Sequence, residues 1–373
     1  MIYLDNAATT LIKPVAVESA ALRAMRTMAS PGRGGHAPAM LAADTVFRCR
    51  LAAAELFNVR EPERIVFTMN ATHALNIAIR SLASKGARVA VSGFEHNSVT
   101  RPLNAMGLEI VTAGVSLFDP EEALEAFDRA LMDVELCVCT HVSNAFGYIL
   151  PIYEIAKLCR DRNVPLIVDA SQSAGVLDVD AEALSAAFIA MPGHKALFGP
   201  QGTGILICSR SWKPLIYGGS GSDSVPQRMP EYLPDALEAG THNVCGIAGL
   251  LEGIKYVQEQ GTDRILRREQ ELLRAMTAEL DGLKGIQLFH GGEGTQSGVL
   301  SLRSADMDCE ALSERLSARG VYVRSGLHCA PFAHRSAGTL STGAVRFSFS
   351  PFVSTEDIAR TCAILQEILR EAA

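Results

Sequence analysis

The sequence predicts an α/β fold: a mostly parallel central sheet covered by helices on both faces, followed by a smaller α+β domain at the C-terminus. Short apolar segments, such as 65–67 and 136–139, alternate with segments of helical period over about the first 250 residues. Within these short segments apolar and polar residues do not alternate, which is typical of parallel strands buried on both faces. Beyond about residue 250 a long amphipathic helix and shorter strands follow, which indicates a second domain of different construction.

The large predicted domain spans residues 13–250. Its first helix is expected around 17–28, where Val17 and Met25 share a face and Pro14 precedes them. Further along the chain, strands are expected at 65–67, 88–91, 108–111, 136–139, 164–168 and 187–190. Helices are expected between them, at 74–82, 120–131 and 151–159.

The smaller predicted domain spans residues 251–373, and the N-terminal segment 1–12 is expected to pack near it. Apolar residues at helical spacing predict a helix over 263–283. Ser354 and Asp357 have the spacing of a capping box, so the last helix is expected to begin there. Strands are expected at 299–302, 321–323 and 345–349.

The composition argues against several classes of function. The net charge of -7 gives no electrostatic support for a nucleic-acid partner. No apolar run approaches the roughly 18 residues of a membrane span, and the N-terminus lacks the basic and apolar regions of a signal peptide. The nine cysteines are scattered without a Cys-x-x-Cys pair, which favours a reduced, cytoplasmic protein over a disulfide framework.

Polar side chains follow five of the six strands predicted in the large domain, at the edge of a parallel sheet where ligands bind. One of them is Lys195, which stands between an apolar approach and the glycine-rich residues 199–204. Taken alone it would be an exposed loop lysine. Among the other polar strand ends it predicts a partly desolvated amine that reacts with a carbonyl compound. These strand ends carry Thr68, Asn70, Thr72, His73, Glu95, His96, Asn97, His141, Ser143, Asn144, Asp169, Ser171, Gln172, His194 and Lys195.

An aldehyde cofactor attached to Lys195 would need four kinds of support, and the strand ends offer each of them. Its phosphate needs N–H groups at a helix start, which residues 70–72 supply together with the Thr72 hydroxyl. Its ring nitrogen needs a carboxylate, and Asp169 stands at the end of a strand. Donors to its phenolate oxygen and a partner for its ring face are offered by Gln172, Asn144 and His96.

With these motifs in order, the sequence resembles the class V aminotransferase family within the fold-type I pyridoxal-phosphate (PLP) enzymes. The resemblance is to its cysteine desulfurase and selenocysteine lyase branch in particular, and it extends over nearly the whole chain. The matching motifs are YLDNAATT (3–10), EHN (95–97), HVSN (141–144), VDASQ (168–172), GHK (193–195), EAGT (238–241), RSGLHCA (324–330) and VRFS (345–348).

The resemblance implies a role for each of these positions. Lys195 would hold PLP covalently and move protons, Asp169 would pair with the ring nitrogen, and Arg346 would bind the substrate carboxylate. Cys329 would be the nucleophile that accepts sulfur. Thr241 would reach the phosphate of the other subunit, so a homodimer is implied. The other implied contacts are Ala71, Thr72 and His194 with the phosphate, Gln172 and Asn144 with the phenolate oxygen, Asn144 with the substrate, and the catalytic His96 on the ring face.

Two positions depart from the usual desulfurase pattern. Pro192 stands where that branch usually has serine, and residues 70–72 read Asn-Ala-Thr in place of Gly-Thr-Thr. Each change removes one hydroxyl donor from the phosphate site. The glycine-rich stretch 30–36 also differs from better-known members, which leaves the physiological substrate open.

Cys329 distinguishes a desulfurase from the other enzymes of this fold. It stands in a polar loop, where the nearby Arg324 and His328 favour the thiolate; a buried, inert thiol is the alternative. A metal site made of His328, Cys329 and His334 matches no zinc spacing well, and we expect no metal.

The expected activity is PLP-dependent conversion of L-cysteine to L-alanine. The sulfur passes to Cys329 as a persulfide and then to a sulfur-acceptor protein. A selenocysteine lyase, or another class V lyase or transaminase, is the alternative enzyme. A non-catalytic sulfur-relay protein of this fold would not need Lys195 and Asp169.

Overall fold

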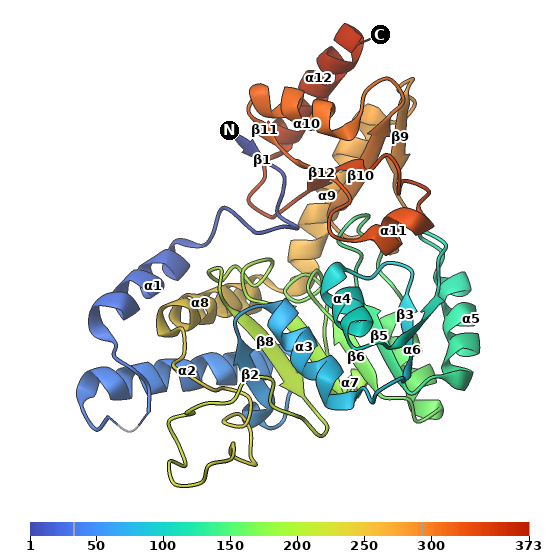
Figure 1. The fold of residues 1–373 in the computed structure, drawn as a ribbon. Coiled ribbons are helices and arrows are strands. Elements are labelled where there is room, and N and C mark those ends of the chain that lie inside the picture. The colour runs from blue at the N-terminus through green and yellow to red at the C-terminus, as the bar shows by residue number, and fades with distance from the viewer. Residues whose placement is uncertain (33, 293, 373) are drawn as a thin grey trace.

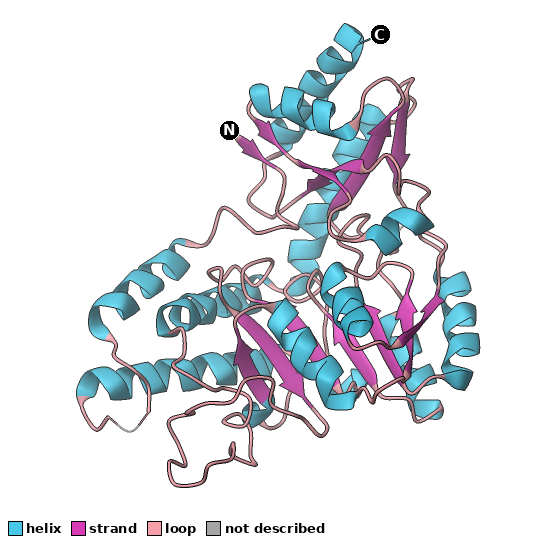
Figure 2. Ribbon diagram, in the orientation of Figure 1, coloured by secondary structure: helices cyan, strands magenta, loops and turns pink. Residues whose placement is uncertain are grey.

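The computed structural model describes residues 1–32, 34–292 and 294–372. Its elements form two lobes, each with its own sheet (Figures 1 and 2). The large lobe holds a seven-stranded sheet in the order β2-β8-β7-β6-β5-β3-β4. Its strands are β2 (Ile65–Thr68), β3 (Arg88–Ser92), β4 (Glu109–Ala113), β5 (Leu136–Thr140), β6 (Leu166–Asp169), β7 (Phe188–Pro192) and β8 (Gly204–Cys208).

The sheet is mostly parallel, as the sequence predicts. Strands β3 to β7 pair in parallel, whereas β8 pairs antiparallel with both β2 and β7. The predicted strands are all present with ends shifted by a few residues, but β8 was not expected. Because β5, β6 and β7 are adjacent and parallel, their carboxyl ends lie side by side at one edge of the sheet.

Helices cover both faces of this sheet, which confirms the predicted α/β class. Successive residues of β2 enter different hydrophobic clusters: Ile65 and Phe67 pack in one, and Val66 packs in the other. The first cluster includes residues of α2, α5, α6 and α8, and the second includes residues of α3 and α4. The helices of this lobe are α1 (Val15–Thr27), α2 (Ala37–Leu56), α3 (Ala71–Leu82), α4 (Asn97–Ala105), α5 (Pro120–Ala130), α6 (Ile152–Asp161), α7 (Ala181–Leu184) and α8 (Val244–Gln260), with short 3-10 turns at Pro62–Arg64 and Leu131–Asp133.

The small lobe is built around a four-stranded antiparallel sheet in the order β12-β13-β10-β9. The first strand of the chain, β1 (Ile2–Tyr3), pairs in parallel with β11 (Val321–Tyr322), so the N-terminus lies in this lobe (Figure 1). The other elements are β9 (Ile286–Phe289), β10 (Val299–Ser304), β12 (Arg324–Gly326), β13 (Ala344–Ser348), α9 (Thr262–Leu280), α10 (Cys309–Ala318), α11 (Pro331–Ser336) and α12 (Thr355–Ala372).

Helices α8 and α9 connect the lobes. Helix α8 packs against α1 and α2, whereas α9 packs against α12, and Gly261 stands between them. The division that we predicted at residue 250 falls within α8, and it stays a prediction.

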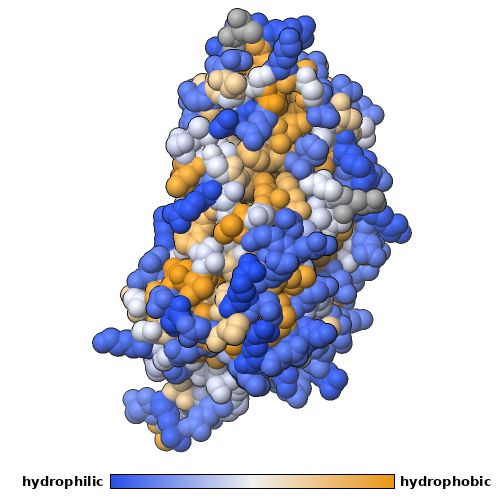
Figure 3. Space-filling model, turned by 90° about the vertical axis from the view of Figure 1, so that its right-hand side faces the viewer, coloured by the Kyte–Doolittle hydropathy of each residue, from blue (hydrophilic) through white to orange (hydrophobic). Residues whose placement is uncertain are grey.

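A long loop, residues 209–243, joins β8 to α8 without a helix or strand of its own. It projects at the bottom of the molecule (Figure 1). The surface on the side of α5 and α6 is mostly hydrophilic, with apolar patches (Figure 3). Tyr217 and Val225 of the loop are 74% and 90% exposed. Among the residues that the structure describes, none of the helices combines the length and apolar character needed to span a membrane.

Candidate active site

All the predicted cofactor residues except Thr241 meet in one pocket of about 200 Å³. It lies at the carboxyl ends of β5, β6 and β7 and at the beginnings of α3 and α4, where ligands bind in open parallel sheets. Eight of the predicted residues line it: Ala71, Thr72, His96, Asn144, Asp169, Gln172, His194 and Lys195.

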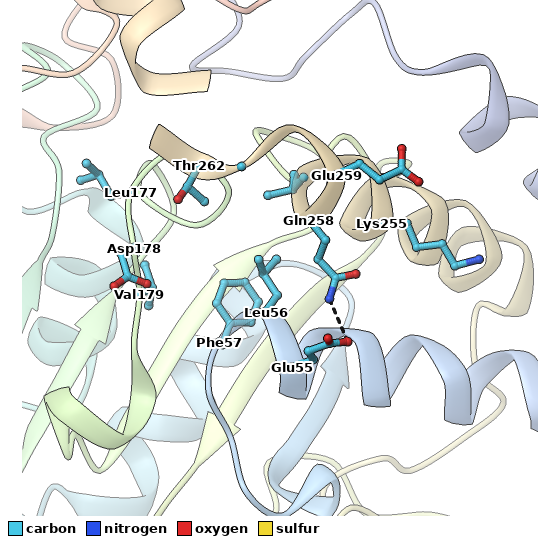
Figure 4. Close-up of a pocket in the computed structure, with 12 residues that line it drawn as sticks. Glu55, Leu56, Phe57, Leu177, Asp178, Val179, Lys255, Gln258, Glu259 and Thr262 are labelled. Carbon is cyan, nitrogen blue, oxygen red and sulfur yellow. Dashed lines mark hydrogen bonds between the residues drawn. The ribbon is translucent and has the colours of Figure 1, made fainter. Parts of the chain in front are cut away.

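A larger cavity, of about 570 Å³, lies elsewhere in the molecule (Figure 4). Its side chains come from the end of α2, from residues 177–179 and from the junction of α8 with α9. Gln258 donates a hydrogen bond to Glu55 across it, at 3.2 Å. None of the predicted site residues lines it, so the smaller pocket is the candidate active site.

Lys195 follows β7 in a tight backbone turn. The Gly199 N–H donates to the Gly193 carbonyl at 2.7 Å, and a Cβ on Gly193 would lie 2.3 Å from the Thr203 hydroxyl. Burial lowers the pKa of Lys195 to about 8, against the opposing charge of Asp169. Its Nζ atom has no hydrogen-bond or ion-pair partner among the described residues. The turn therefore presents an unpaired, desolvated amine to the pocket, which suits reaction with an aldehyde.

Asp169, the last residue of β6, places a carboxylate beside that amine. It is 2% exposed, and its Oδ1 atom accepts a hydrogen bond from the Ser171 N–H at 2.9 Å. Its Oδ2 atom accepts none from any described residue, although Asp169 lines the pocket. One carboxylate oxygen is thus free to accept a hydrogen bond from a protonated nitrogen of a ligand.

His96 is the N-cap of α4 and lines the pocket. Its Nδ1 atom accepts a hydrogen bond from the Ser98 N–H at 3.0 Å, so in the neutral ring the proton is on Nε2. Burial lowers the pKa of His96 to about 4, with Asp169 opposing the shift. A neutral imidazole in a fixed orientation is suited to lie against an aromatic ring.

The beginnings of α3 and α4 meet at a pair of hydroxyl groups. Asn70 caps α3 by accepting from the His73 N–H at 2.9 Å, which leaves the earlier N–H groups without partners inside the helix. The Thr72 and Ser98 hydroxyls are 2.7 Å apart, and Ser98 lies 2.9 Å from His96 Nδ1. N–H groups, hydroxyls and helix dipoles in such an arrangement are suited to bind a phosphate. Ser98 was not among the predicted residues; its hydroxyl lines the same pocket as Pro192, where the usual pattern has a serine hydroxyl.

The N-terminal segment closes one side of the pocket. Gln172 donates to the Ala7 carbonyl at 3.0 Å, and His194 Nδ1 lies 3.1 Å from the Thr9 hydroxyl. The Thr10 hydroxyl donates to the Lys195 carbonyl at 2.8 Å. Segment 3–10, which begins in the small lobe, therefore holds the lysine turn of the large lobe in place.

Arg346 lies behind the pocket and does not line it. It is 2% exposed, and its guanidinium donates to Asp5 Oδ1 at 2.6 Å and to the Asn144 carbonyl at 2.9 Å. Its buried Nε atom has no hydrogen-bond partner. Arg324 shares the Asp5 carboxylate, at 3.0 Å. The predicted contact of Arg346 with a substrate carboxylate stays a prediction, since existing partners occupy part of its fork.

Thr241 stands apart from the Lys195 pocket. It lines a different cavity, of about 210 Å³, together with Met69, His73 and Glu238 at the β2 and β8 edge. Its predicted reach into a second subunit is therefore not a contact within one chain, and it stays a prediction.

Cys329 is exposed, whereas the other cysteines are buried or, for Cys245, half-buried. It lies in a turn in which the Ala330 N–H donates to the Leu327 carbonyl at 2.8 Å. Both central residues have positive φ, +52° at His328 and +55° at Cys329. Such a conformation costs about 1–3 kcal/mol for each residue other than glycine, so contacts from outside the turn must hold it.

Two hydrogen bonds tie this turn to the pocket. The Asn97 N–H donates to the Cys329 carbonyl, and Asn144 Nδ2 donates to the His328 carbonyl, both at 2.7 Å. Asn144 lines the pocket and Asn97 follows the pocket residue His96. The backbone of the Cys329 turn is thereby held against residues at the lysine pocket, although Cys329 does not line the pocket. Within the described parts of the chain, no three His, Cys, Asp or Glu side chains are grouped as metal ligands.

Comparison with known proteins shows the family of the chain. The family model Aminotransferase class-V matches residues 2–361. A probable cysteine desulfurase of Pyrococcus abyssi is 30% identical, over 99% of this chain and 94% of that protein. A probable cysteine desulfurase of Methanothermobacter thermautotrophicus is 32% identical, over 98% and 94%.

Solved structures extend the likeness to the fold. The apo cysteine desulfurase of Thermococcus onnurineus is 28% identical, covers 99% of this chain and 95% of its own, and superposes with a TM-score of 0.91. A cysteine desulfurase of Escherichia coli shares the fold at 23% identity, with a TM-score of 0.88 and coverage of 100% and 95%. The match over residues 2–361 and the lysine pocket at the strand ends lead to one conclusion: the chain belongs to the class V aminotransferase family.

Proposed function

We propose that the chain is a PLP-dependent cysteine desulfurase, which converts L-cysteine to L-alanine and takes the sulfur onto Cys329 as a persulfide. The observation that carries this proposal is the exposed Cys329 thiol, held beside the Lys195 pocket by Asn97 and Asn144. The names of the relatives support it. A transaminase would need the lysine pocket but no nucleophile beside it.

The donors around the pocket fit PLP. The unpartnered Lys195 amine would bind its aldehyde, and the free oxygen of Asp169 would hold the proton of its ring nitrogen. When bound, PLP supplies an electron sink that stabilises negative charge at the substrate Cα. The remaining contacts would be Ala71, Thr72 and His194 with its phosphate, Gln172 and Asn144 with its phenolate oxygen, and His96 with its ring face.

The chain's own groups account for the movement of protons and sulfur. With its pKa lowered to about 8, the Lys195 amine accepts the proton that leaves Cα and returns one later. The Cys329 thiolate attacks the substrate Sγ; a new S–S bond forms as the Cβ–Sγ bond breaks, and its electron pair stays on the carbon side. Protonation at carbon gives alanine. The outer sulfur then passes to an acceptor thiol, which the exposure of Cys329 permits.

The substrate carboxylate would be held by Arg346 and Asn144. Arg346 is a buried cation whose Nε has no partner, and it already contacts the Asn144 carbonyl. A carboxylate that enters next to it would gain charge-assisted hydrogen bonds in a desolvated position.

A homodimer would complete the site, with Thr241 of one copy reaching the phosphate of the other. Two features of the surface support this. Thr241 is an exposed residue near the end of the loop 209–243 and stands outside the Lys195 pocket of its own chain. Helices α1 and α2 expose the large apolar side chains Leu22, Met25, Met40, Leu41, Phe47 and Leu51, and exposed apolar groups of this extent are typical of an interface.

Product analysis tests the activity. The protein is loaded with PLP and incubated with L-cysteine and a thiol, and alanine, sulfide and keto acid are measured together. We expect alanine and sulfide in equal amounts without keto acid, and neither product from Cys329→Ala. Keto acid without sulfide would show a transaminase instead, and activity restricted to selenocysteine would show a selenocysteine lyase.

A further inference from the structure

The turn that carries Cys329 has a second support, in the contact between the His328 and His334 side chains. Its central residue His328 turns its ring inward, where it is 7% exposed, and His334 of α11 lies against it at 0% exposure. The two rings are nearly parallel, with their centres 5.2 Å apart. The proposed reaction uses neither side chain, yet they are the buried imidazoles closest in sequence to the nucleophile.

A continuous line of hydrogen bonds runs through these rings. His328 Nε2 lies 3.2 Å from the Arg324 carbonyl, and His328 Nδ1 lies 3.0 Å from His334 Nε2. His334 Nδ1 lies 2.8 Å from the Thr339 hydroxyl. Every ring nitrogen of the pair therefore has one partner.

The carbonyl at one end determines which atoms donate. A carbonyl only accepts, so His328 Nε2 carries a proton; the ring is neutral because burial and the nearby Arg346 lower its pKa, and its Nδ1 must accept. His334 Nε2 is then the donor. Burial lowers the pKa of His334 to about 4, so its Nδ1 accepts from the Thr339 hydroxyl. All the donors point the same way, from Thr339 towards Arg324.

We propose that His334 is a positioning residue for sulfur transfer: its Nε2–H holds the His328 ring, and thereby keeps the strained turn in the conformation that aims the Cys329 thiol at the substrate sulfur. The proposal rests on the proposed function, because it presupposes that Cys329 accepts the sulfur. The reason is mechanical. Two successive residues in the left-handed region relax unless they are held, and the Asn97 and Asn144 contacts hold only the carbonyls of the turn.

Two substitutions at one position test the role of the donor. His334→Leu fills the space without a donor, whereas His334→Gln keeps an N–H that can reach His328 Nδ1. Cys362→Ala is the matched control, because Cys362 is also buried in the small lobe but lies in α12 and is not part of the hydrogen-bonded line. For each variant, kcat and KM for L-cysteine, the persulfide on Cys329 and the affinity for PLP are measured.

We expect His334→Leu to lower kcat about tenfold or more, with a parallel loss of persulfide and little change in KM or PLP affinity. His334→Gln should recover most of kcat, and Cys362→Ala should leave it unchanged. The proposal is overturned if His334→Leu keeps kcat within about twofold, if His334→Gln is as poor as His334→Leu, or if PLP affinity falls together with kcat.

Thr339→Val decides the question if His334→Leu does not fold. It removes the hydroxyl that lies 2.8 Å from His334 Nδ1 and 3.4 Å from the His334 carbonyl, and we expect a smaller fall in kcat and persulfide; no fall would overturn the proposal. Cys329→Ala distinguishes a failure of the proposed function from a failure of the role proposed for His334. If it turns over L-cysteine at the wild-type rate, the proposed function fails; if it is inactive while His334→Leu is fully active, only the role of His334 fails.

Discussion

The Lys195 pocket and the Cys329 turn are the two halves of the proposed site, and they are built in different ways. The pocket consists of strand ends and helix beginnings of one sheet, so the main hydrophobic clusters hold its residues in place. The turn has two residues in a strained conformation and depends on individual hydrogen bonds from Asn97, Asn144 and His334. The cofactor half should therefore tolerate changes in the turn, whereas the turn should be sensitive to the loss of a single donor.

The largest effect is expected when the pocket half alone is changed, at Lys195. Lys195→Ala removes the amine that would bind PLP, so we expect complete loss of turnover while Cys329 stays reactive. Borohydride reduction of the wild-type protein with PLP should place the cofactor on the peptide that contains Lys195. Attachment to a different lysine would refute this assignment.

A smaller effect is expected when the carboxylate is neutralised. Asp169→Asn keeps the shape of the side chain and its contact with the Ser171 N–H, but an amide does not hold a pyridinium proton by charge. We expect bound PLP with a strongly reduced kcat. The comparison of kcat with PLP affinity checks this, and wild-type turnover with PLP bound would disprove the role of Asp169.

The free energy of unfolding should have a maximum near neutral pH. On the acid side, buried histidines in both halves of the site should lower it. Burial lowers the pKa values of His96, His194 and His334 from 6.5 to about 4. Between those values the unfolded chain binds more protons than the folded one, so stability falls as the pH falls. Burial raises the pKa values of Glu95 and Glu269 from 4.5 to about 8. Between these two pH values the folded chain binds more protons than the unfolded one, so stability falls as the pH rises.

Urea unfolding at several pH values measures this balance. We expect the midpoint to be highest near pH 6.5, where the histidine contribution is complete, and to fall towards pH 8. Glu269→Gln should flatten the fall on the alkaline side. A midpoint that rises steadily from pH 6.5 to pH 8 would contradict the assignment of buried, protonated carboxyl groups.

The smallest expected effect concerns the hydroxyl pair. Ser98→Ala removes one donor from the proposed phosphate site and leaves Thr72. A hydrogen bond to a charged group contributes about 1.5–3 kcal/mol, so PLP should bind about tenfold or more weakly. Pyridoxal, which has no phosphate, serves as the control ligand and should bind equally to both proteins. An equal loss for both ligands would place Ser98 elsewhere in the mechanism.

The sequence predicts which residues meet in the Lys195 pocket, because a simple rule applies there. Polar residues after buried strands of a parallel sheet meet at one edge, and Asp169, His194 and Lys195 follow this rule. Ser98 could have been found in the same way, since it stands two residues beyond His96. It was missed because the helix α4, which turns its hydroxyl towards Thr72, was not expected.

Two long helices, α2 and α8, were not predicted, and their content of alanine and glycine explains why. Helix α8 contains Gly246, Gly249 and Gly253, which on propensity argue against a helix. In the structure they permit close packing: a Cβ on Gly253 would lie 2.1 Å from the Leu197 carbonyl oxygen. Helix α2 is rich in alanine and has no clear polar face, so its period is weak. Tertiary packing, which a single sequence does not reveal, determines that both segments are helical.

The turn half was predictable only as a polar loop with a cysteine. Its positive φ angles lie at His328 and Cys329, which carry no local signal for such a conformation. The contacts that hold it join residues far apart in the chain, such as Asn144 with His328. Long-range hydrogen bonds of this kind leave no periodic pattern in a sequence.

The measurement that tests the central claim most directly is to locate the transferred sulfur. The PLP-loaded protein is incubated briefly with L-cysteine, its thiols are blocked, and its peptides are analysed by mass spectrometry, with Cys329→Ala as the control. The account predicts one added sulfur atom on the peptide that contains Cys329, formed together with alanine, and neither product in the control. Alanine formed without sulfur on Cys329, or sulfur on another cysteine, would contradict the claim that the Lys195 pocket and the Cys329 turn form one desulfurase site.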